Sequence, residues 1–354
     1  MQNFGKNQNN QKIFSKKYPK EYPLLFWALL SIFLFSCRAN SNFYAEIPPT
    51  EIPVHSPSSQ TTQSPTPFSE NIPFTITPSE LPPTATPTDT PQPSIHFAVI
   101  GDYGSGDQNE ANVAKLVKSW NPDFIITTGD NNYPIGSEAT IDYNIGQFYH
   151  EYIYPYHGQF GAGAPVNRFF PTLGNHDWMS QSAKPYLDYF QLPNNERYYE
   201  FTWGAIQFFM LDSDSNEPDG VASTSLQAKW LEQQMRSSSS TWQLVVMHHP
   251  PYSSGLRGPV EWMRWRFQEW GADAVLCGHD HYYERLLENG LVFFINGAGG
   301  GSLYNFGTPA EGSLKRFNSE YGAMLVTANN SSITFQFFSV SGKLIDQYQL
   351  NKNK

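Results

Sequence analysis

The sequence contains little cysteine, little charge and no long apolar segment. Two of its 354 residues are cysteines, Cys37 and Cys277, so a disulfide framework is excluded as the stabilising device. Charged residues make up 15%, and 32 Asp and Glu against 22 Lys and Arg give a net charge of −10. This acidic balance excludes the broad basic surface with which proteins bind phosphate backbones. Nucleic acid is therefore not a predicted partner.

The longest apolar run, residues 24–35 (LLFWALLSIFLF), has 12 residues. It is shorter than the roughly 20 residues that a membrane-spanning helix needs. Five lysines precede it, and a basic leader followed by a short apolar core is typical of an export signal. Residues 1–36 are therefore predicted to be a signal peptide.

Cys37 directly follows this signal, with Leu34 three residues before it and Ser36 next to it. The pattern resembles the cleavage site of bacterial lipoproteins, although Phe35 fits its second position poorly. It predicts a lipid anchor on Cys37 and an exported, extracytoplasmic protein held at the bacterial membrane surface. Two alternatives stay open, namely ordinary secretion with Cys37 incidental or removed, and retention of the apolar run as an anchor.

Residues 37–94 are rich in Pro, Ser and Thr, and residues 40–94 hold 13 of the 27 prolines. Such a segment buries too little apolar surface to fold, and repeated X-Pro bonds favour extended geometry. It is predicted to be a disordered linker that spaces the following domain from a surface. A Pro-rich ligand for a partner protein is the alternative.

Residues 95–350 are predicted to form the single folded domain, because short apolar runs alternate there with helical patterns. Helical spacing covers residues 109–120 and 225–236. The predicted strands are mostly apolar, as in α/β domains whose strands are buried on both faces. The runs lie at residues 95–100, 124–128, 168–173, 206–211, 244–247 and 274–276, with further strands after residue 291.

Five polar blocks carry residues that bind metals, and four of them directly follow an apolar run. In α/β sheets, ligands bind beyond the carboxyl ends of the strands, so these blocks are predicted to meet at one site. Any one block alone is weak evidence, whereas the ordered set of five is specific. The blocks are residues 101–104 (GDYG), 129–133 (GDNNY), 174–177 (GNHD), 247–250 (MHHP) and 278–281 (GHDH).

The ordered set resembles the metallophosphoesterase superfamily and, more narrowly, the small purple acid phosphatases of the tartrate-resistant type. The resemblance covers about residues 95–350 and also rests on residues 208–213 (FFMLDS). The discriminating residue is Tyr133, three positions after Asp130, since purple acid phosphatases use such a tyrosine to bind ferric iron. The resemblance implies a calcineurin-like four-layer αββα sandwich.

The resemblance also implies a binuclear centre of Fe(III) and a divalent ion, either Fe, Zn or Mn. The implied ligands of Fe(III) are Asp102, Tyr133 and His281, those of the divalent ion are Asn175, His248 and His279, and Asp130 bridges the two. The family pattern selects His248 over His249 because one residue separates the ligand from Pro250. Independently, carboxylate and phenolate oxygens suit a hard trivalent ion, while imidazole suits divalent Fe or Zn.

Three residues are predicted substrate contacts. His176 is implied to face the phosphate and to protonate the leaving group. His249 is a further candidate, although alternation along a strand predicts that it points away from His248. Arg257 stands where the small purple acid phosphatases have a second substrate-facing histidine, and an arginine can bind phosphate through two N–H groups but stays protonated and is a poor acid.

Four further features have local interpretations. Asp177 and Asp280 either orient neighbouring histidines or stabilise turns. Residues 297–301 (GAGGG) predict a turn near the site rather than a nucleotide-binding loop, because no phosphate-binding helix pattern follows them. Cys277 is predicted to be a small buried residue near the site.

The predicted function is hydrolysis of a small phosphomonoester by an acid-phosphatase-like enzyme. The nucleophile is a hydroxide bound at the binuclear centre, and Asp130 and His176 are the catalytic residues. Three alternatives stay open: a phosphodiesterase on the same metals, a manganese enzyme without ferric iron, and a non-catalytic surface-binding lipoprotein.

Overall fold

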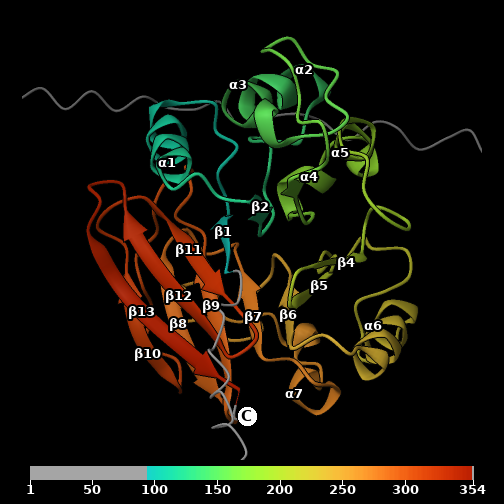
Figure 1. Ribbon diagram of the computed structural model, residues 1–354, viewed down its shortest axis with the longest axis vertical. Coiled ribbons are helices and arrows are strands. Elements are labelled where there is room, and N and C mark those ends of the chain that lie inside the picture. Colours follow the sequence, from blue (N-terminus) through green and yellow to red (C-terminus); the bar gives the residue numbers. More distant parts are fainter. Residues whose placement is uncertain (1–93, 353–354) are drawn as a thin grey trace, which may run out of the picture. The chain divides into compact units, whose positions relative to one another are not determined.

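A computed structural model describes residues 94–352 of the chain. The predicted signal peptide, Cys37 and the linker lie outside the described residues. Two sheets form the centre of the described domain (Figure 1). The six-stranded sheet has the order β13 (Leu344–Asn351), β12 (Ser332–Ser339), β11 (Gly322–Ala328), β1 (Ile95–Ile100), β2 (Phe124–Thr127), β3 (Phe169–Phe170). The seven-stranded sheet has the order β10 (Ser313–Phe317), β8 (Tyr283–Glu288), β9 (Leu291–Asn296), β7 (Ala274–Cys277), β6 (Trp242–Val246), β5 (Ile206–Met210), β4 (Tyr199–Trp203).

Both sheets are mixed, and the parallel strands carry the site. Strands β1, β2 and β3 run parallel to one another, as do β5, β6, β7 and β9. The remaining strands pair antiparallel at the edges of these parallel sets. Parallel strands end at the same edge of their sheet, so the blocks after β1, β2 and β3 meet at one sheet edge and those after β6 and β7 meet at the edge of the other sheet. Contacts between the two sets, such as the hydrogen bond from the His279 N–H to Asp102, bring all five blocks together.

The helices are short apart from α1 and α6, which have 12 residues each. In Figure 1, α1 to α5 lie above β1 and β2, and α6 and α7 lie at the lower right beside β5 and β6. The α-helices are α1 (Gln108–Ser119), α2 (Glu138–Ile141), α3 (Gln147–Tyr149), α4 (Asn175–Trp178), α5 (Lys184–Tyr189), α6 (Leu226–Ser237) and α7 (Phe267–Trp270). The other helical turns are η1 (Asp142–Gly146), η2 (His150–Tyr152), η3 (Gln181–Ala183) and η4 (Glu261–Met263).

The period-2 alternation of side chains in the strands divides the apolar residues into two clusters. On β6, Leu244 and Val246 face the core between the two sheets, while Val245 faces a second cluster under α6 and α7. Ring contacts cross between the sheets, for example Phe97 to Phe208 with centroids 5.3 Å apart. Helix α1 packs against the six-stranded sheet at β11. The order helix, sheet, sheet, helix is the predicted four-layer sandwich.

Helix α1 illustrates how the sequence forms a local element. The Asp107 side chain caps its start by accepting from the backbone N–H groups of Asn109 and Glu110. Val113, Ala114 and Val117 are buried on one face, with the spacing of an amphipathic helix. The predicted strand over residues 168–173 is shorter, Phe169–Phe170, because Pro171 has no N–H to donate to a ladder.

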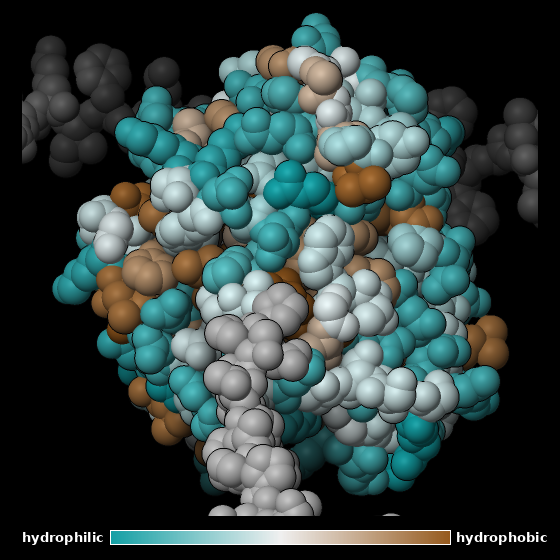
Figure 2. All heavy atoms as spheres, viewed as in Figure 1, coloured by the Kyte–Doolittle hydropathy of each residue, from teal (hydrophilic) through white to brown (hydrophobic). Residues whose placement is uncertain are grey.

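The surface is mostly polar on the face in Figure 2, where apolar residues lie in small separate groups outside the grey atoms. Within residues 94–352, no helix is long and apolar enough to cross a membrane.

Candidate metal centre

Five loops converge at the carboxyl ends of the parallel strands. Each predicted ligand follows β1, β2, β3, β6 or β7 within a few residues. Three of the ligands have left-handed backbone conformations, with φ of 54° at Asp102, 52° at Asp130 and 70° at His279. Such conformations turn the chain sharply as it leaves a strand and are uncommon for residues other than glycine. They direct these side chains into the site.

Asp102, Tyr133 and His281 form one group of donors. The Tyr133 hydroxyl oxygen lies 3.4 Å from Asp102 Oδ1 and 3.0 Å from His281 Nε2. His281 Nε2 lies 3.3 Å from Asp102 Oδ1. Both Asp102 and His281 are buried. The donor atoms of the predicted ligands of the first ion therefore lie 3.0–3.4 Å from one another, close enough to bind the same ion.

Asn175, His248 and His279 form the second group. Asn175 Oδ1 lies 3.1 Å from His248 Nε2 and 3.0 Å from His279 Nδ1. The two imidazole nitrogens are 3.2 Å apart. This group contains no carboxylate, so a cation bound there would face only neutral donors apart from its link to the first group.

Asp130 supplies that link. Its Oδ2 accepts from the Tyr133 hydroxyl at 3.0 Å, and its Oδ1 lies 3.4 Å from His248 Nε2. The carboxylate is 1% exposed. One oxygen thus faces each group, which is the position that a bridging ligand requires.

Backbone carbonyls orient two of the imidazoles. His248 Nδ1 lies 2.8 Å from the Thr128 carbonyl oxygen, and His281 Nδ1 lies 2.8 Å from that of Ser302. A carbonyl only accepts, so each Nδ1 carries a proton and each neutral ring presents the Nε2 lone pair to the site. Two glycines allow this packing, because a Cβ would lie 2.7 Å from His248 Nδ1 at Gly129 (φ +89°) and 2.7 Å from the His281 ring at Gly301.

The electrostatics of the buried groups favour a bound cation. Burial raises the pKa of Tyr133 well above its usual value, and the carboxylates of Asp130 and Asp102 raise it further. Burial also raises the pKa of Asp130, but the neighbouring His248 outweighs it and holds that pKa below its usual range. In His248, burial opposes protonation, yet Asp130 raises its pKa to about 10. A cation would replace the proton shared by this pair and stabilise the Tyr133 phenolate.

His279 behaves differently from His248. Burial and then the neighbouring His248 lower the pKa of His279 to about 3. The ring is therefore neutral at physiological pH, as a metal-binding imidazole must be.

His176 and Arg257 lie at the rim of the site. The His176 side chain is 26% exposed, and its Nε2 lies 3.9 Å from Asp130 Oδ2. Its Nδ1 is held by the Pro134 carbonyl at 2.5 Å, so Nε2 is the nitrogen turned toward the donors. Arg257 is exposed, and its Nη2 donates to the Tyr304 hydroxyl at 3.3 Å.

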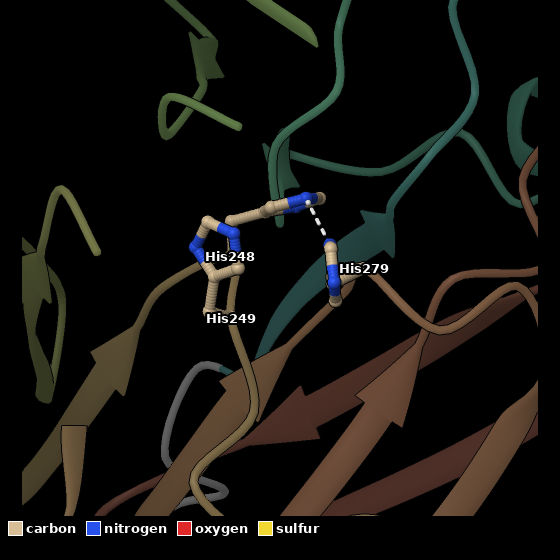
Figure 3. Close-up of side chains that lie close together, drawn as sticks. All are labelled: His248, His249 and His279. Atoms are coloured by element: carbon tan, nitrogen blue, oxygen red, sulfur yellow. Dashed lines mark hydrogen bonds between the residues drawn. The ribbon is translucent and has the colours of Figure 1, made fainter. Parts of the chain in front are cut away.

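The predicted orientation of His249 is wrong. Its ring lies beside those of His248 and His279, with centroids 4.9 Å and 4.5 Å away, and Figure 3 shows the three rings gathered together. Strand β6 ends at Val246, so the alternation of a strand no longer applies two residues later. His249 is largely buried and pairs with Ser213, whose Oγ lies 2.9 Å from Nδ1. Burial lowers its pKa well below the usual value.

Asp177 stabilises the turn at Gly174 and Asp280 links two segments, rather than orienting histidines. Asp177 accepts from the Gly174 N–H at 2.8 Å and from the Asn131 side chain at 2.8 Å, and burial raises its pKa to about 7. Asp280 accepts from the hydroxyls of Ser253 and Tyr282. Both carboxylates therefore tie one ligand loop to another segment.

Several residues around the site were not predicted from the sequence. Tyr304 stacks on His281 with ring centroids 4.0 Å apart and planes 10° apart. Ser302 orients the same histidine. Both follow the glycine-rich segment 297–301, which lies against Asp102 and His281 as the predicted turn near the site. Their only sequence signal is position after that segment. Cys277 is buried as predicted, at the end of β7.

Comparison with known proteins agrees with this geometry. Residues 95–283 match the calcineurin-like phosphoesterase family. The chain belongs to the calcineurin-like phosphoesterases. The matched range contains all of the donor residues described above.

Within this family, the chain is similar to acid phosphatases. It is 27% identical over 250 residues to tartrate-resistant acid phosphatase type 5 of Mus musculus, covering 59% of this chain and 73% of that protein. It is 24% identical over 300 residues to purple acid phosphatase 17 of Arabidopsis thaliana, covering 73% and 85%.

Two solved structures share the fold. Purple acid phosphatase PPD1 from yellow lupin superposes with a TM-score of 0.59 at 17% identity, over 73% of this chain and 54% of the lupin chain. The phosphoesterase chain thus spans about half the length of the lupin protein. GAP50, the anchor in the inner membrane complex of Plasmodium, superposes with a TM-score of 0.57 at 21% identity, over 74% and 90%.

The donor set fits the binuclear metal site that the family implies. Two tight groups of three donors share one carboxylate, and the buried Asp102, Asp130 and His248 place donor atoms within 4.8 Å of one another. His248, His249 and His279 do the same. Carboxylate, phenolate, amide and imidazole donors suit Fe, Zn and Mn. This phosphoesterase is therefore a metal-dependent hydrolase.

Proposed function

We propose that this phosphoesterase is an acid phosphatase that hydrolyses small phosphomonoesters at a centre of Fe(III) and a divalent ion. Asp102, Tyr133 and His281 would hold Fe(III), Asn175, His248 and His279 would hold divalent Fe, Zn or Mn, and Asp130 would bridge them. The printed names of the mouse and Arabidopsis relatives support the acid phosphatase activity.

The position of Tyr133 carries the proposal. Its hydroxyl oxygen lies 3.0 Å from both Asp130 Oδ2 and His281 Nε2, so it is part of the first donor group. The His176 ring, with its centroid 4.6 Å away and its plane tilted by 59°, packs beside it. A carboxylate and a phenolate make this group the more anionic one even without the shared Asp130, and hard anionic oxygen donors favour a trivalent ion.

The two ions, if held by these residues, would supply Lewis-acid chemistry: they would polarise the phosphate and lower the pKa of a nucleophilic water. The protein's own groups do the rest. His176 Nε2 faces the donors from the rim and would give a proton to the departing alcohol oxygen, since its Nδ1 is held by a carbonyl. Arg257 would contact the phosphate oxygens through its N–H groups.

His249 would support this site by contact rather than by proton transfer. Its ring is largely buried, and burial lowers its pKa well below the usual value. A neutral imidazole beside His248 and His279 would place one N–H or lone pair near a bound phosphate without adding charge.

The visible spectrum of the iron-loaded protein tests the proposal. We expect a tyrosinate-to-iron charge-transfer band that disappears in Tyr133→Phe, because the phenylalanine ring has no oxygen donor. Metal analysis of both proteins controls for loss of iron. If the wild-type protein is colourless with one iron per chain, the assignment of Fe(III) to the Tyr133 group is refuted and a manganese enzyme is favoured.

The similarity to the Plasmodium anchor protein favours a second candidate, a non-catalytic surface protein. The complete donor set argues against it, because a binding role needs no second group of ligands. Turnover decides between them: hydrolysis of phenyl phosphate supports the phosphatase, and preferential hydrolysis of a bis-aryl phosphate supports a phosphodiesterase. A metal-loaded protein that is inert toward both esters supports the surface protein.

A further inference from the structure

Trp262 is an exposed aromatic side chain on the loop that follows the ligand His248. It lies in the short turn η4 and is 46% exposed. Burial is the usual state of large aromatic side chains, and an exposed one beside a site is a candidate binding surface.

Contacts fix the position of the Trp262 ring relative to the site. Its Nε1 donates to the Ser213 carbonyl at 3.3 Å. Its centroid lies 6.4 Å from that of His249, which in turn lies 4.5 Å from His279. Ser213 also holds His249 through its hydroxyl. Trp262 is therefore held at the edge of the second donor group, with part of its surface facing solvent.

Arg257 marks the opposite edge. Its guanidinium carbon lies 5.0 Å from the centre of the Tyr304 ring, and Tyr304 stacks on His281. The same loop thus places a cation beside the first donor group and an indole beside the second. The organic part of a phosphate ester bound over the donors would pass the rim of the site, where Trp262 presents an exposed aromatic side chain.

We propose that Trp262 is a specificity-determining residue that stacks on a planar aromatic leaving group of the phosphomonoester. This inference rests on the proposed phosphatase function. Arg257 contacts the phosphate that every substrate shares, whereas Trp262 contacts the part in which substrates differ. The enzyme then prefers aryl phosphates over alkyl phosphates by more than their intrinsic reactivity.

The physical reason is the flat apolar face that the indole presents. Offset or edge-on contact between two aromatic rings is favourable beyond the area it buries, and a ring held in place by a hydrogen bond loses little freedom when a substrate binds. An alkyl chain gains only the free energy of burying its apolar surface. Tyr143 and Tyr154, the other exposed aromatic side chains in the part of the chain described, make no ring contact with the donor residues; Tyr143 packs against Phe160 instead.

The test compares Trp262→Ala with the wild-type metal-loaded enzyme on phenyl phosphate and on glycerol 2-phosphate. Each substrate is compared with itself, so intrinsic reactivity cancels. We expect kcat/KM for phenyl phosphate to fall by about three- to tenfold and kcat/KM for glycerol 2-phosphate to change by less than about twofold. Trp262→Phe, which keeps a ring, should retain most of the preference.

Calorimetric binding gives a readout independent of turnover. Phenylphosphonate should bind more tightly than methylphosphonate to the wild type, and the two should converge in Trp262→Ala. Arg257→Ala should weaken both phosphonates by the same factor. Tyr143→Ala, which removes another exposed aromatic side chain (54% exposed), is the matched control and should change neither.

Equal losses on both substrates in folded Trp262→Ala, or no loss on either, would overturn the inference. Absence of turnover on both esters by the wild type would instead overturn the proposed function. In that case the phosphonate binding data alone decide the role of Trp262. Tighter binding of phenylphosphonate than of methylphosphonate that is lost in Trp262→Ala supports stacking. Equal binding of the two phosphonates to the wild type refutes it.

Discussion

At the scale of single residues, the site depends on backbone conformations that few side chains adopt. Asp102, Asp130 and His279 have φ between 52° and 70°, and a non-glycine residue in this region costs on the order of 1–3 kcal/mol. The cost is offset locally, since the Asp102 carboxylate accepts from the His279 N–H at 2.9 Å and Asp130 accepts from the His176 N–H at 2.9 Å. Ligand side chains therefore also hold the loops that carry them.

Asp130→Asn tests the bridging position. The amide keeps the shape of the side chain but removes the charge between the two donor groups, so both ions should bind more weakly. Substitution of residues that only support metal ligands already lowers metal affinity or activity by about 10- to 100-fold. The loss on substituting a bridging ligand should be at least as large as the upper value. Metal content by mass spectrometry and kcat on phenyl phosphate measure the effect.

Asp188→Asn is the matched control, because that carboxylate is exposed and pairs with Lys184 on α5. It should leave both readings unchanged. Near-normal turnover of Asp130→Asn with two ions bound would refute the two-metal centre.

At the scale of elements, loops and helix ends bring the donors to the sheet edges, and α1 carries a buried acid. Glu110 in its first turn is 0% exposed. Its Oε2 accepts from the Gly106 N–H at 2.7 Å, whereas Oε1 has no hydrogen-bond partner within residues 94–352. Burial raises the pKa of Glu110 well above its ordinary value of 4.5.

Glu110→Gln should make stability less dependent on pH. The folded state holds the Glu110 proton more tightly than the unfolded state, so its contribution is complete below about pH 4.5 and is lost as the pH rises through the folded pKa. Each pH unit in that window removes at most about 1.4 kcal/mol, or a few degrees of melting temperature. Thermal unfolding from pH 4 to pH 8 at constant metal loading should show a shallower decline in the variant.

Glu138→Gln makes the same chemical change at an exposed glutamate in the first turn of α2. The melting temperature of Glu138→Gln should fall with rising pH as steeply as that of the wild type. If Glu110→Gln and the wild type follow the same pH curve, the buried acid does not titrate as described.

At the scale of the whole molecule, the sequence predicts an exported protein that a lipid on Cys37 holds at a membrane surface. The prediction lies outside the described residues and rests on residues 24–37 and on the Pro-rich segment that follows. Cys37→Ser should move the protein from the membrane fraction to the soluble fraction of expressing bacteria, because the thiol is the attachment point. An unchanged membrane fraction with the signal processed would rule out lipidation.

The sequence alone was enough to predict the α/β class and the convergence of five blocks, whereas the paired layers were implied by the resemblance to the metallophosphoesterases. The class and the convergence follow from local information: apolar runs, and polar residues where each run ends. Asp102 and Asp130 share a site because the parallel strands β1 and β2 are neighbours and end at one sheet edge. His279 follows β7 in the other sheet, so the packing of the two sheets brings it to the same site.

Tertiary structure alone decided the surroundings of those ligands. The direction in which the His249 ring points depends on where β6 ends. The contacts of Tyr304, Ser302 and Trp262 join segments that are far apart in the chain. The roles of Asp177 and Asp280 also depend on which N–H groups and hydroxyls the fold brings to them. No periodicity encodes these contacts, because each arises from packing between loops. The residue types of the donors were therefore set by the sequence, and their neighbours by the fold.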